Sequence, residues 1–243
     1  TVLTAEQGKL PVIVRGARRK RSPYAASAQP LVYAEWTLYH RGAWYYANDA
    51  ETLQLFDGLR RDLDALALGF YFAELTEAVT EEEVPATELL RHLLNGLYAL
   101  SELKKPPELV KAAFEWKLLS LSGYEPLADG CAVCGLESPR EPVFDLVQGV
   151  VYCAACGSAP KGQSVPLSPG MLAALRHVLY GDPKRLYSFR LGTAELHAFA
   201  QAAERFLLVQ MDRGFRTLDF YKSLQPVPTD NAPARQQQGR ETR

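Results

Sequence analysis

The spacing of apolar residues divides this chain into a strand-like beginning and a longer helical part. In residues 10–16 and 31–40, apolar and polar side chains alternate at every second position, which is typical of half-buried strands. A turn at residues 41–42 leads into a third predicted strand, 43–48. From residue 59 onward, apolar side chains recur every three or four positions, as on the buried face of a helix. The pattern predicts an α+β protein in which the strands precede the helices.

Five helices are predicted in the second part. They cover about residues 59–79, 85–100, 108–123, 169–179 and 193–211. Thr80 and Glu83 have the spacing of a capping box at the start of the second helix. Ser168 followed by Pro169 predicts an N-cap with proline at the first helical position. Residues 226–243 are rich in proline, glutamine and charge, which predicts a disordered tail.

The cysteines of the chain form two C-x2-C pairs, Cys131 with Cys134 and Cys153 with Cys156. This spacing is typical of a four-thiolate zinc site, because the short gap lets one turn direct both sulfurs at one metal. Between the pairs lie valine and aromatic residues and a predicted turn at residues 148–149. This pattern predicts a small β-ribbon that the metal holds together. Four thiolates leave no open coordination position, so we expect one structural Zn²⁺ per chain.

Other interpretations of the cysteines remain open, namely two disulfides, redox activity or unpaired thiols. Two disulfides would require an oxidising compartment, and the beginning of the chain has no apolar signal stretch. Redox chemistry at C-x2-C usually involves a single pair in a thioredoxin-like setting.

No run approaches the roughly 18 apolar residues of a membrane span, so we expect a cytoplasmic protein that does not bind membranes.

Charge is distributed unevenly along the chain. The net charge is −1, but residues 1–48 carry seven basic and two acidic side chains. Residues 49–130 carry seven basic and sixteen acidic side chains, and residues 131–243 carry thirteen and ten. Such an asymmetry favours a polyanionic partner for the beginning of the chain.

The excess of positive charge is concentrated in residues 15–21, where five of seven side chains are Lys or Arg. A stretch rich in serine, proline and alanine follows, which predicts a flexible basic loop. Tyrosine and tryptophan also occur on the predicted strands. Basic side chains neutralise phosphates and aromatic faces stack on bases, so the combination favours a small nucleic-acid-binding barrel. The alternative is a solvated loop beside aromatic residues that only pack within the sheet.

No catalytic constellation is recognisable in the sequence. The histidines are dispersed without ligand or triad spacing, and no glycine-rich phosphate loop occurs. Paired carboxylates are also lacking, since the acidic run 81–83 is explained as a helix cap near the positive end of the helix dipole. We therefore expect a protein without enzymatic activity.

Several short segments together resemble the bacterial recombination-mediator family RecO, a DNA-repair family. The matching segments are 6–10, 14–19, 58–63, 116–119, 123–124, 131–135 and 167–170. Their order and spacing carry the resemblance, which covers about residues 1–225. It implies an α+β fold with an N-terminal OB-fold β-barrel, followed by a helical bundle with an inserted four-cysteine zinc finger.

The domain bounds expected from this resemblance are 1–55 for the OB-fold, 56–128 and 161–225 for the two parts of the bundle, 129–160 for the zinc finger and 226–243 for the tail. The chain begins where the first strand of the family finishes. We therefore expect the barrel to lack one strand edge.

The resemblance also implies a function. RecO proteins bind single- and double-stranded DNA, promote annealing of complementary strands and help to load the recombinase, with RecR and the single-strand-binding protein SSB as partners at the nucleoid. By motif match, the implied DNA contacts are Lys9, Arg15, Arg18, Arg19, Lys20 and Arg21. A zinc-containing protein–protein adaptor without direct DNA binding is the main alternative. A zinc-dependent RNA-modifying enzyme is disfavoured, because the metal site is expected to be closed.

Overall fold

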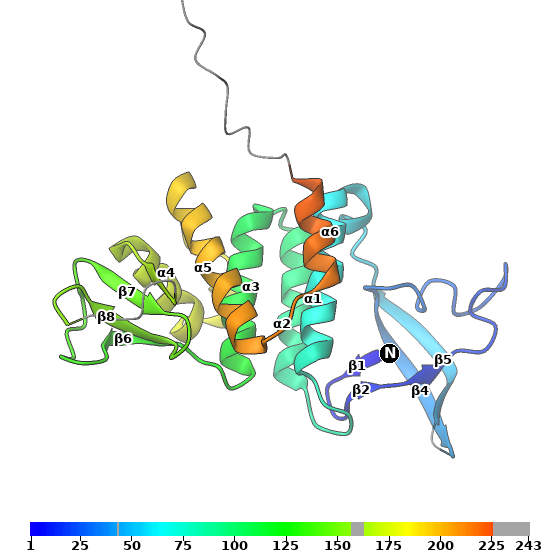
Figure 1. The fold of residues 1–243 in the computed structure, drawn as a ribbon. Helices are drawn as coiled ribbons and strands as arrows, with labels where there is room; N and C mark the ends of the chain where they lie inside the picture. The colour runs from blue at the N-terminus through cyan, green and yellow to red at the C-terminus, as the bar shows by residue number, and fades with distance from the viewer. Residues whose placement is uncertain (43, 157–162, 226–243) are drawn as a thin grey trace, which may run out of the picture.

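The computed structural model describes residues 1–42, 44–156 and 163–225. Figure 1 shows α1, α2, α3, α5 and α6 in the centre, with the N-terminal strands on one side and a second sheet together with α4 on the other. The α+β class predicted from the sequence is therefore confirmed. The predicted tail, 226–243, and the end of the predicted zinc finger lie outside the described residues.

The N-terminal strands form two separate sheets. β1 (Val2–Thr4) pairs with β2 (Gly8–Leu10) in an antiparallel hairpin. β3 (Val12–Ile13) runs parallel to β5 (Trp44–Gln54), and β4 (Tyr33–Arg41) runs antiparallel to β5. In β4 the exposed and half-buried side chains alternate, as the sequence predicted.

The predicted β-barrel is not closed in this structure. Among the described residues, no strand pairing joins the β1–β2 hairpin to the β3–β5–β4 sheet. Pro11 separates β2 from β3, and a proline has no backbone N–H to contribute to a ladder. Beyond β3, residues 14–32 form turns instead of further strands. The prediction of an OB-fold β-barrel is thus confirmed only in part, because the N-terminal strands are present but these described residues do not close them into a barrel.

The turn-rich segment 14–32 packs against the β4–β5 hairpin. The ring of Tyr24 stacks on Trp36 of β4 at a centroid distance of 6.2 Å. The hydroxyl of Tyr24 donates to the backbone oxygen of Asn48, 2.8 Å away, and the hydroxyls of Ser27 and Thr52 lie 2.7 Å apart. The basic segment is thus held at its far end by contacts to both strands of the hairpin.

The described residues form six α-helices and two short 3-10 helices, η1 and η2 (Figure 1). Their bounds are η1 Leu59–Arg61, α1 Leu63–Val79, α2 Thr87–Ser101, α3 Pro107–Leu121, α4 Pro169–Tyr180, η2 Pro183–Arg185, α5 Thr193–Met211 and α6 Arg216–Leu224. The five predicted helices are confirmed as α1 to α5. In the described part of the chain, no helix is both long and apolar enough to span a membrane.

Side-chain caps fix the starts of two helices. The carboxylate of Asp62 accepts a hydrogen bond from the backbone N–H of Ala65, 3.1 Å away, at the start of α1. Ser168 accepts from the N–H of Met171 at the start of α4, as its spacing before proline predicted. The predicted capping box at Thr80 is wrong, because this hydroxyl donates back to the carbonyl oxygen of Thr76 at the end of α1.

The sequence analysis missed α6. This helix packs along α1, with Leu218 and Tyr221 buried. The carboxylate of Glu74 in α1 accepts hydrogen bonds from both the N–H and the hydroxyl of Thr217. At the other end of α6, Lys222 forms an ion pair with Glu204 of α5. These contacts extend the bundle beyond the five helices that the apolar spacing indicated.

The second sheet shares one hydrophobic core with the helices. Its strands are β6 (Leu127–Cys131), β7 (Pro142–Asp145), β8 (Val150–Cys153) and β9 (Ser164–Pro166), in the order β6-β8-β7-β9. Phe144 of β7 packs edge-on against Trp116 of α3 and Phe206 of α5, with ring centroids 5.3 and 5.0 Å away. These three rings are fully buried, so the sheet is part of the bundle's core.

Candidate metal centre and nucleic-acid interface

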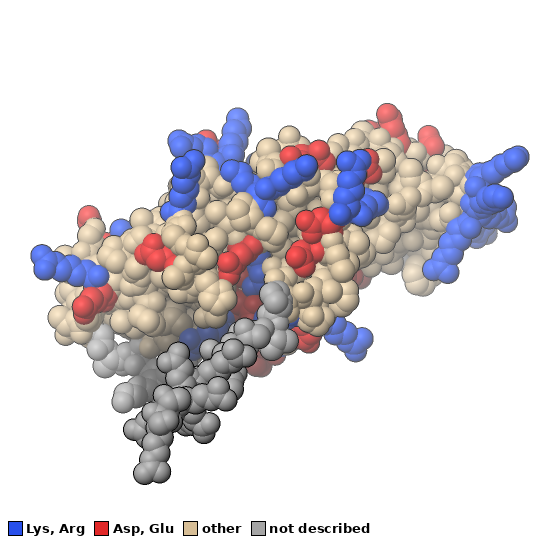
Figure 2. All heavy atoms as spheres, turned by 90° about the horizontal axis from the view of Figure 1, so that it is seen from above, with Lys and Arg blue, Asp and Glu red and all other residues tan. Residues whose placement is uncertain are grey.

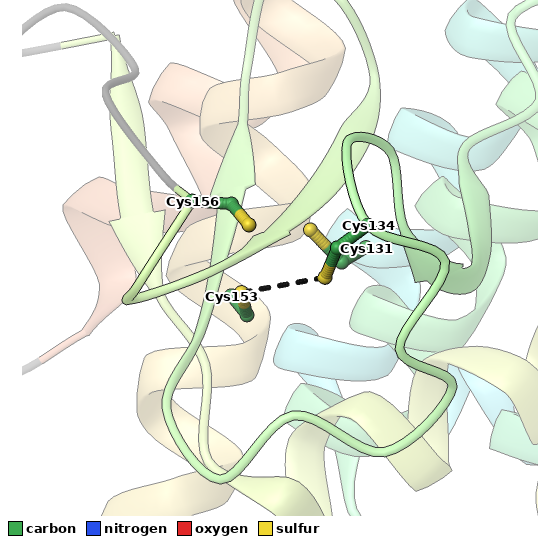
Figure 3. Close-up of side chains that lie close together, drawn as sticks. All are labelled: Cys131, Cys134, Cys153 and Cys156. Atoms are coloured by element: carbon green, nitrogen blue, oxygen red, sulfur yellow. Dashed lines mark hydrogen bonds between the residues drawn. The ribbon is translucent and has the colours of Figure 1, made fainter.

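The four cysteine thiols lie together at one end of the second sheet. Cys131 ends β6 and Cys153 ends β8, while Cys134 and Cys156 follow each of them in a turn (Figure 3). All four sulfur atoms lie within 4.8 Å of one another. Cys131 and Cys153 are buried, whereas Cys134 is exposed. The parallel pairing of β6 with β8 brings the two C-x2-C turns side by side.

The turns are shaped by backbone hydrogen bonds. The N–H of Gly135 donates to the carbonyl of Cys131, and the N–H of Cys156 donates to that of Cys153. Gly135 has a φ of 72°, a left-handed conformation that glycine adopts without strain. Backbone N–H groups, first that of Cys134, lower the pKa of the Cys131 thiol to about 6. The thiolate, the form that binds a metal, is thus favoured at Cys131, whereas hydrogen bonding to the neighbouring sulfurs, first that of Cys153, raises the pKa of the Cys156 thiol to about 12.

The arrangement fits a structural metal ion. The sulfurs of Cys134 and Cys153 are 3.8 Å apart, and none of the four cysteines is joined in a disulfide. In a tetrahedral site with metal–sulfur bonds of about 2.3 Å, neighbouring sulfurs are separated by about 3.8 Å. Four thiolates would complete the coordination of such an ion. The residues therefore suit a metal that holds the two turns together.

Two helices hold this four-cysteine unit against the bundle. The guanidinium of Arg176 in α4 donates to the backbone oxygens of Ala128, Asp129 and Glu137. On the other side, the amide of Gln210 in α5 donates to the carbonyls of residues 146 and 147, at 2.9 and 3.0 Å. The ribbon is thus fixed from both sides as well as by its buried rings.

The basic segment 15–21 emerges directly from β3. The guanidinium carbon of Arg15 lies 5.0 Å from the ring centroid of Tyr46 on β5. The next four cations are all exposed; they are Arg18, Arg19, Lys20 and Arg21. Figure 2 shows Lys and Arg side chains gathered at the end of the molecule that the N-terminal strands form.

Aromatic side chains cluster at the end of the β4–β5 hairpin beside Arg15. Tyr39 and Tyr46 face each other across the strands, with centroids 5.4 Å apart and an interplanar angle of 17°. Tyr39 is 45% exposed and Trp44 is 49% exposed. We call the surface of Arg15, Tyr39, Trp44 and Tyr46 the hairpin tip. It combines a cation with aromatic faces that solvent can reach.

The other end of the same hairpin is acidic. Glu35 and Glu51 are direct partners across the strands, and Asp49 faces Thr37 two pairs closer to the tip. All three carboxylates are on exposed residues. On the hairpin itself, these three carboxylates weaken the attraction of a polyanion, so the tip and the basic segment are the more favourable part of this sheet for a polyanion.

Comparison with known proteins identifies the family. A family model described as recombination protein O C terminal matches residues 60–219, and one described as recombination protein O N terminal matches residues 1–56. The chain belongs to the RecO family. A "DNA repair protein RecO" from Symbiobacterium thermophilum is 30% identical, over 92% of this chain and 89% of that protein. Proteins of the same description from Acetivibrio thermocellus and Clostridium novyi are 28% and 31% identical, over 93% and 80% of this chain and 90% and 72% of those proteins.

One of the DNA contacts implied by the RecO motifs has a structural partner. The ammonium of Lys9 donates to the backbone oxygen of Glu77, 3.2 Å away, in the last turn of α1. A cation at this position also interacts favourably with the negative end of the helix dipole. Lys9 therefore joins β2 to the bundle, whereas the cations of segment 15–21 project from the N-terminal unit.

The four histidines have local partners instead of forming a common site. His92 is buried and its Nε2 lies 3.0 Å from the backbone oxygen of Phe114. His177 contacts the backbone oxygen of Arg185, and His40 packs against Tyr45. The fourth, His197, pairs with the carboxylate of Glu108, 2.8 Å away. Each histidine is thus accounted for by packing or by a hydrogen bond.

Proposed function

We propose that this chain is a DNA-binding recombination mediator that holds DNA on the hairpin tip and on segment 15–21. The observation that carries the proposal is the contact of Arg15 with Tyr46, because it joins the basic segment to the aromatic tip as one continuous surface. Four exposed cations extend this surface beyond Arg15. Membership in a family of DNA repair proteins supports the same assignment.

The chemistry of this surface suits DNA without regard to sequence. Arg and Lys bind phosphates, which are the same at every nucleotide, and tyrosine faces stack on any base. Stacking requires an unpaired base, so the tip favours single strands, whereas the cations also bind a duplex. A surface that neutralises phosphates lowers the repulsion between two strands, and this would promote annealing of complementary strands.

Further features of the proposal follow from the family. We propose that the protein acts without an enzymatic activity, helps to load the recombinase on chromosomal DNA, and works with RecR and the single-strand-binding protein SSB. We also propose that the metal is Zn²⁺, bound by Cys131, Cys134, Cys153 and Cys156 in a purely structural role. Elemental analysis of protein purified without chelator tests the metal, with one zinc per chain as the expected result.

Replacing the exposed cations of the basic segment tests DNA binding. In the variant with Arg18, Arg19, Lys20 and Arg21 changed to Ala, four phosphate contacts are lost. Each contact contributes about 0.7 to the slope of log affinity against log salt for single strands, so the slope should fall by about 3. The loss should be equal for different base sequences, and annealing should slow in parallel. Fluorescence anisotropy over a range of salt concentrations measures the slope.

A control variant separates loss of these contacts from loss of net charge. Arg140, Arg213, Lys184 and Arg216 lie outside the N-terminal unit, and their change to Gln removes the same charge. This control should bind single strands as the wild type does. If the first variant keeps the wild-type affinity and slope, the surface does not bind DNA. The protein–protein adaptor would then be the better account.

A further inference from the structure

A cleft lies at the junction between the N-terminal sheet and the helical bundle. It is bordered by the end of β5, by residues 55–62 and by the loop between α2 and α3, and its volume is about 1000 Å³. We call it the junction cleft. Figure 2 looks onto the end of the molecule where α1 and α3 begin, and basic and acidic side chains are interspersed there. Cavities at domain junctions are frequent ligand sites.

Three cations line the junction cleft without a partner in the described part of the chain. They are Arg61, Lys104 and Lys105, none of which has a side-chain hydrogen bond or ion pair there. Arg60 beside them differs, because its guanidinium donates to the backbone oxygen of Leu55, 2.6 Å away. Arg60 thus anchors the chain, whereas the other three are available to an anion.

The cleft also offers hydrogen-bonding groups and an apolar surface. Gln54 and Asp57 line it, and among the described residues their side chains have no hydrogen-bond partner. The other two carboxylates are occupied, since Asp62 caps α1 and Glu102 accepts from Ser101. Leucine and proline side chains supply the apolar part; they are Leu53, Leu55, Pro106 and Pro107.

The backbone segments that form the wall of the cleft are tightly packed against each other. A side chain at Gly58 would place its Cβ only 2.2 Å from the backbone oxygen of Ser101, so only glycine allows η1 to approach the end of α2 this closely. Phe56 and Lys104, which both line the cleft, have φ angles of 51° and 47°. Residues other than glycine adopt this left-handed conformation only when their surroundings enforce it. The cleft is therefore preformed.

We infer that the junction cleft binds nucleotides of a second single strand of DNA, separate from the strand on the hairpin tip. Phosphates would contact Arg61, Lys104 and Lys105, and the donor groups of a base would reach Asp57 and Gln54. The inference rests on the proposed function, because it assigns a further site for the same ligand. Two sites on one chain would hold both strands that annealing has to join.

The mixture of charges favours single-stranded nucleic acid over other anions. An acidic peptide would meet three carboxylates as well as the three cations, which weakens its attraction. A nucleotide combines an anionic phosphate with neutral base edges that donate hydrogen bonds, and so it matches both kinds of group. A duplex keeps its base edges paired, and a concave cleft reaches its backbone poorly. The cleft therefore suits a strand before it has paired.

Counting the strands bound per chain tests this inference. The cleft variant carries Arg61→Gln, Lys104→Asn and Lys105→Gln; asparagine is chosen because it tolerates the left-handed conformation. With an oligonucleotide of about four nucleotides, too short to reach from the tip to the cleft along the roughly 35 Å of β5, the wild type should bind two molecules per chain. The cleft variant should bind one, at the hairpin tip. The lost binding event should carry a salt slope of about 2, from three phosphate contacts.

Different results would refute the second site in the cleft and the proposed interface at the hairpin tip. A cleft variant that binds two oligonucleotides and anneals at the wild-type rate would overturn the inference, even when the variant of segment 15–21 loses binding as proposed. If the cleft variant loses both binding events together, the cleft and the tip belong to one path, which also overturns a separate second site. An acidic peptide of the same length that competes for the second event would reassign the cleft to a protein partner. The control Arg140→Gln, Lys184→Gln, Arg216→Gln removes the same charge elsewhere and should bind two.

Discussion

Protonation of His92 should destabilise this protein in mild acid. The imidazole is buried in α2 and stacks on Phe114 of α3, with centroids 4.2 Å apart. Burial, together with the charge of Lys117, lowers the pKa of His92 to about 4 from its ordinary value of 6.5. The neutral ring is thus strongly preferred in the folded state.

The sign and size of the effect follow from this pKa. Between pH 6.5 and about 4, the unfolded chain binds a proton at His92 that the folded protein does not bind. The free energy of unfolding therefore decreases as the pH falls through this range. Each pKa unit corresponds to about 1.4 kcal/mol, so the full loss is about 3 kcal/mol, of which about 2.5 kcal/mol is reached near pH 4.5.

Urea unfolding of the wild type and of His92→Gln measures the effect. Glutamine does not titrate, and its amide can donate to the backbone oxygen of Phe114 as the imidazole does. Both proteins carry the same cysteines, so release of a metal in acid affects them alike. Between about pH 7.5 and about pH 4.5, the wild type should lose about 2.5 kcal/mol more than the variant. An equal loss in both proteins would refute the assignment to His92.

Three further predictions concern the four-cysteine unit and the bundle. Cys131→Ser should abolish tight metal binding and speed amide exchange in the two turns. The strand of Phe144 should stay protected from exchange, because it is packed in the core. Hydrogen exchange therefore distinguishes local loosening of the turns from unfolding of the whole ribbon. Arg176→Ala removes three hydrogen bonds to the ribbon and should destabilise the ribbon by about 3 kcal/mol. The variant should also lose its metal to a chelator faster than the wild type does. Equal rates of metal loss in the two proteins would contradict the anchoring role of Arg176. Lys111→Met leaves the carboxylate of Glu115 buried without its cation and should lower the free energy of unfolding by about 3–5 kcal/mol, and adding Glu115→Gln should recover part of it.

Local patterns in the sequence predicted the features that depend on neighbouring residues. The C-x2-C spacing indicated that four thiols share one site, and the structure brings them within 4.8 Å. Ser168 before Pro169 predicted the start of α4, because a cap and its first turn lie within four residues. The apolar period identified α1 to α5 for the same reason.

Features set by contacts between distant segments could not be derived in this way. Thr80 has the spacing of a cap, yet its hydroxyl bonds to the preceding helix, since α1 extends to Val79. The short helix α6 depends on Glu74, which lies far away in the sequence. The contact of Arg15 with Tyr46 requires the parallel pairing of β3 with β5, and no local pattern predicts that register.

The position of bound DNA is the most direct test of the proposed interface. Single strands containing bromouracil can be cross-linked by light at low occupancy, and the attached peptides identified by mass spectrometry. Bases stacked on the hairpin tip should cross-link to Tyr39 or Trp44, and to peptides that contain segment 15–21. The yield should fall in the variant of Arg18, Arg19, Lys20 and Arg21. Cross-links confined to residues 127–211, with none in the N-terminal strands, would contradict the account.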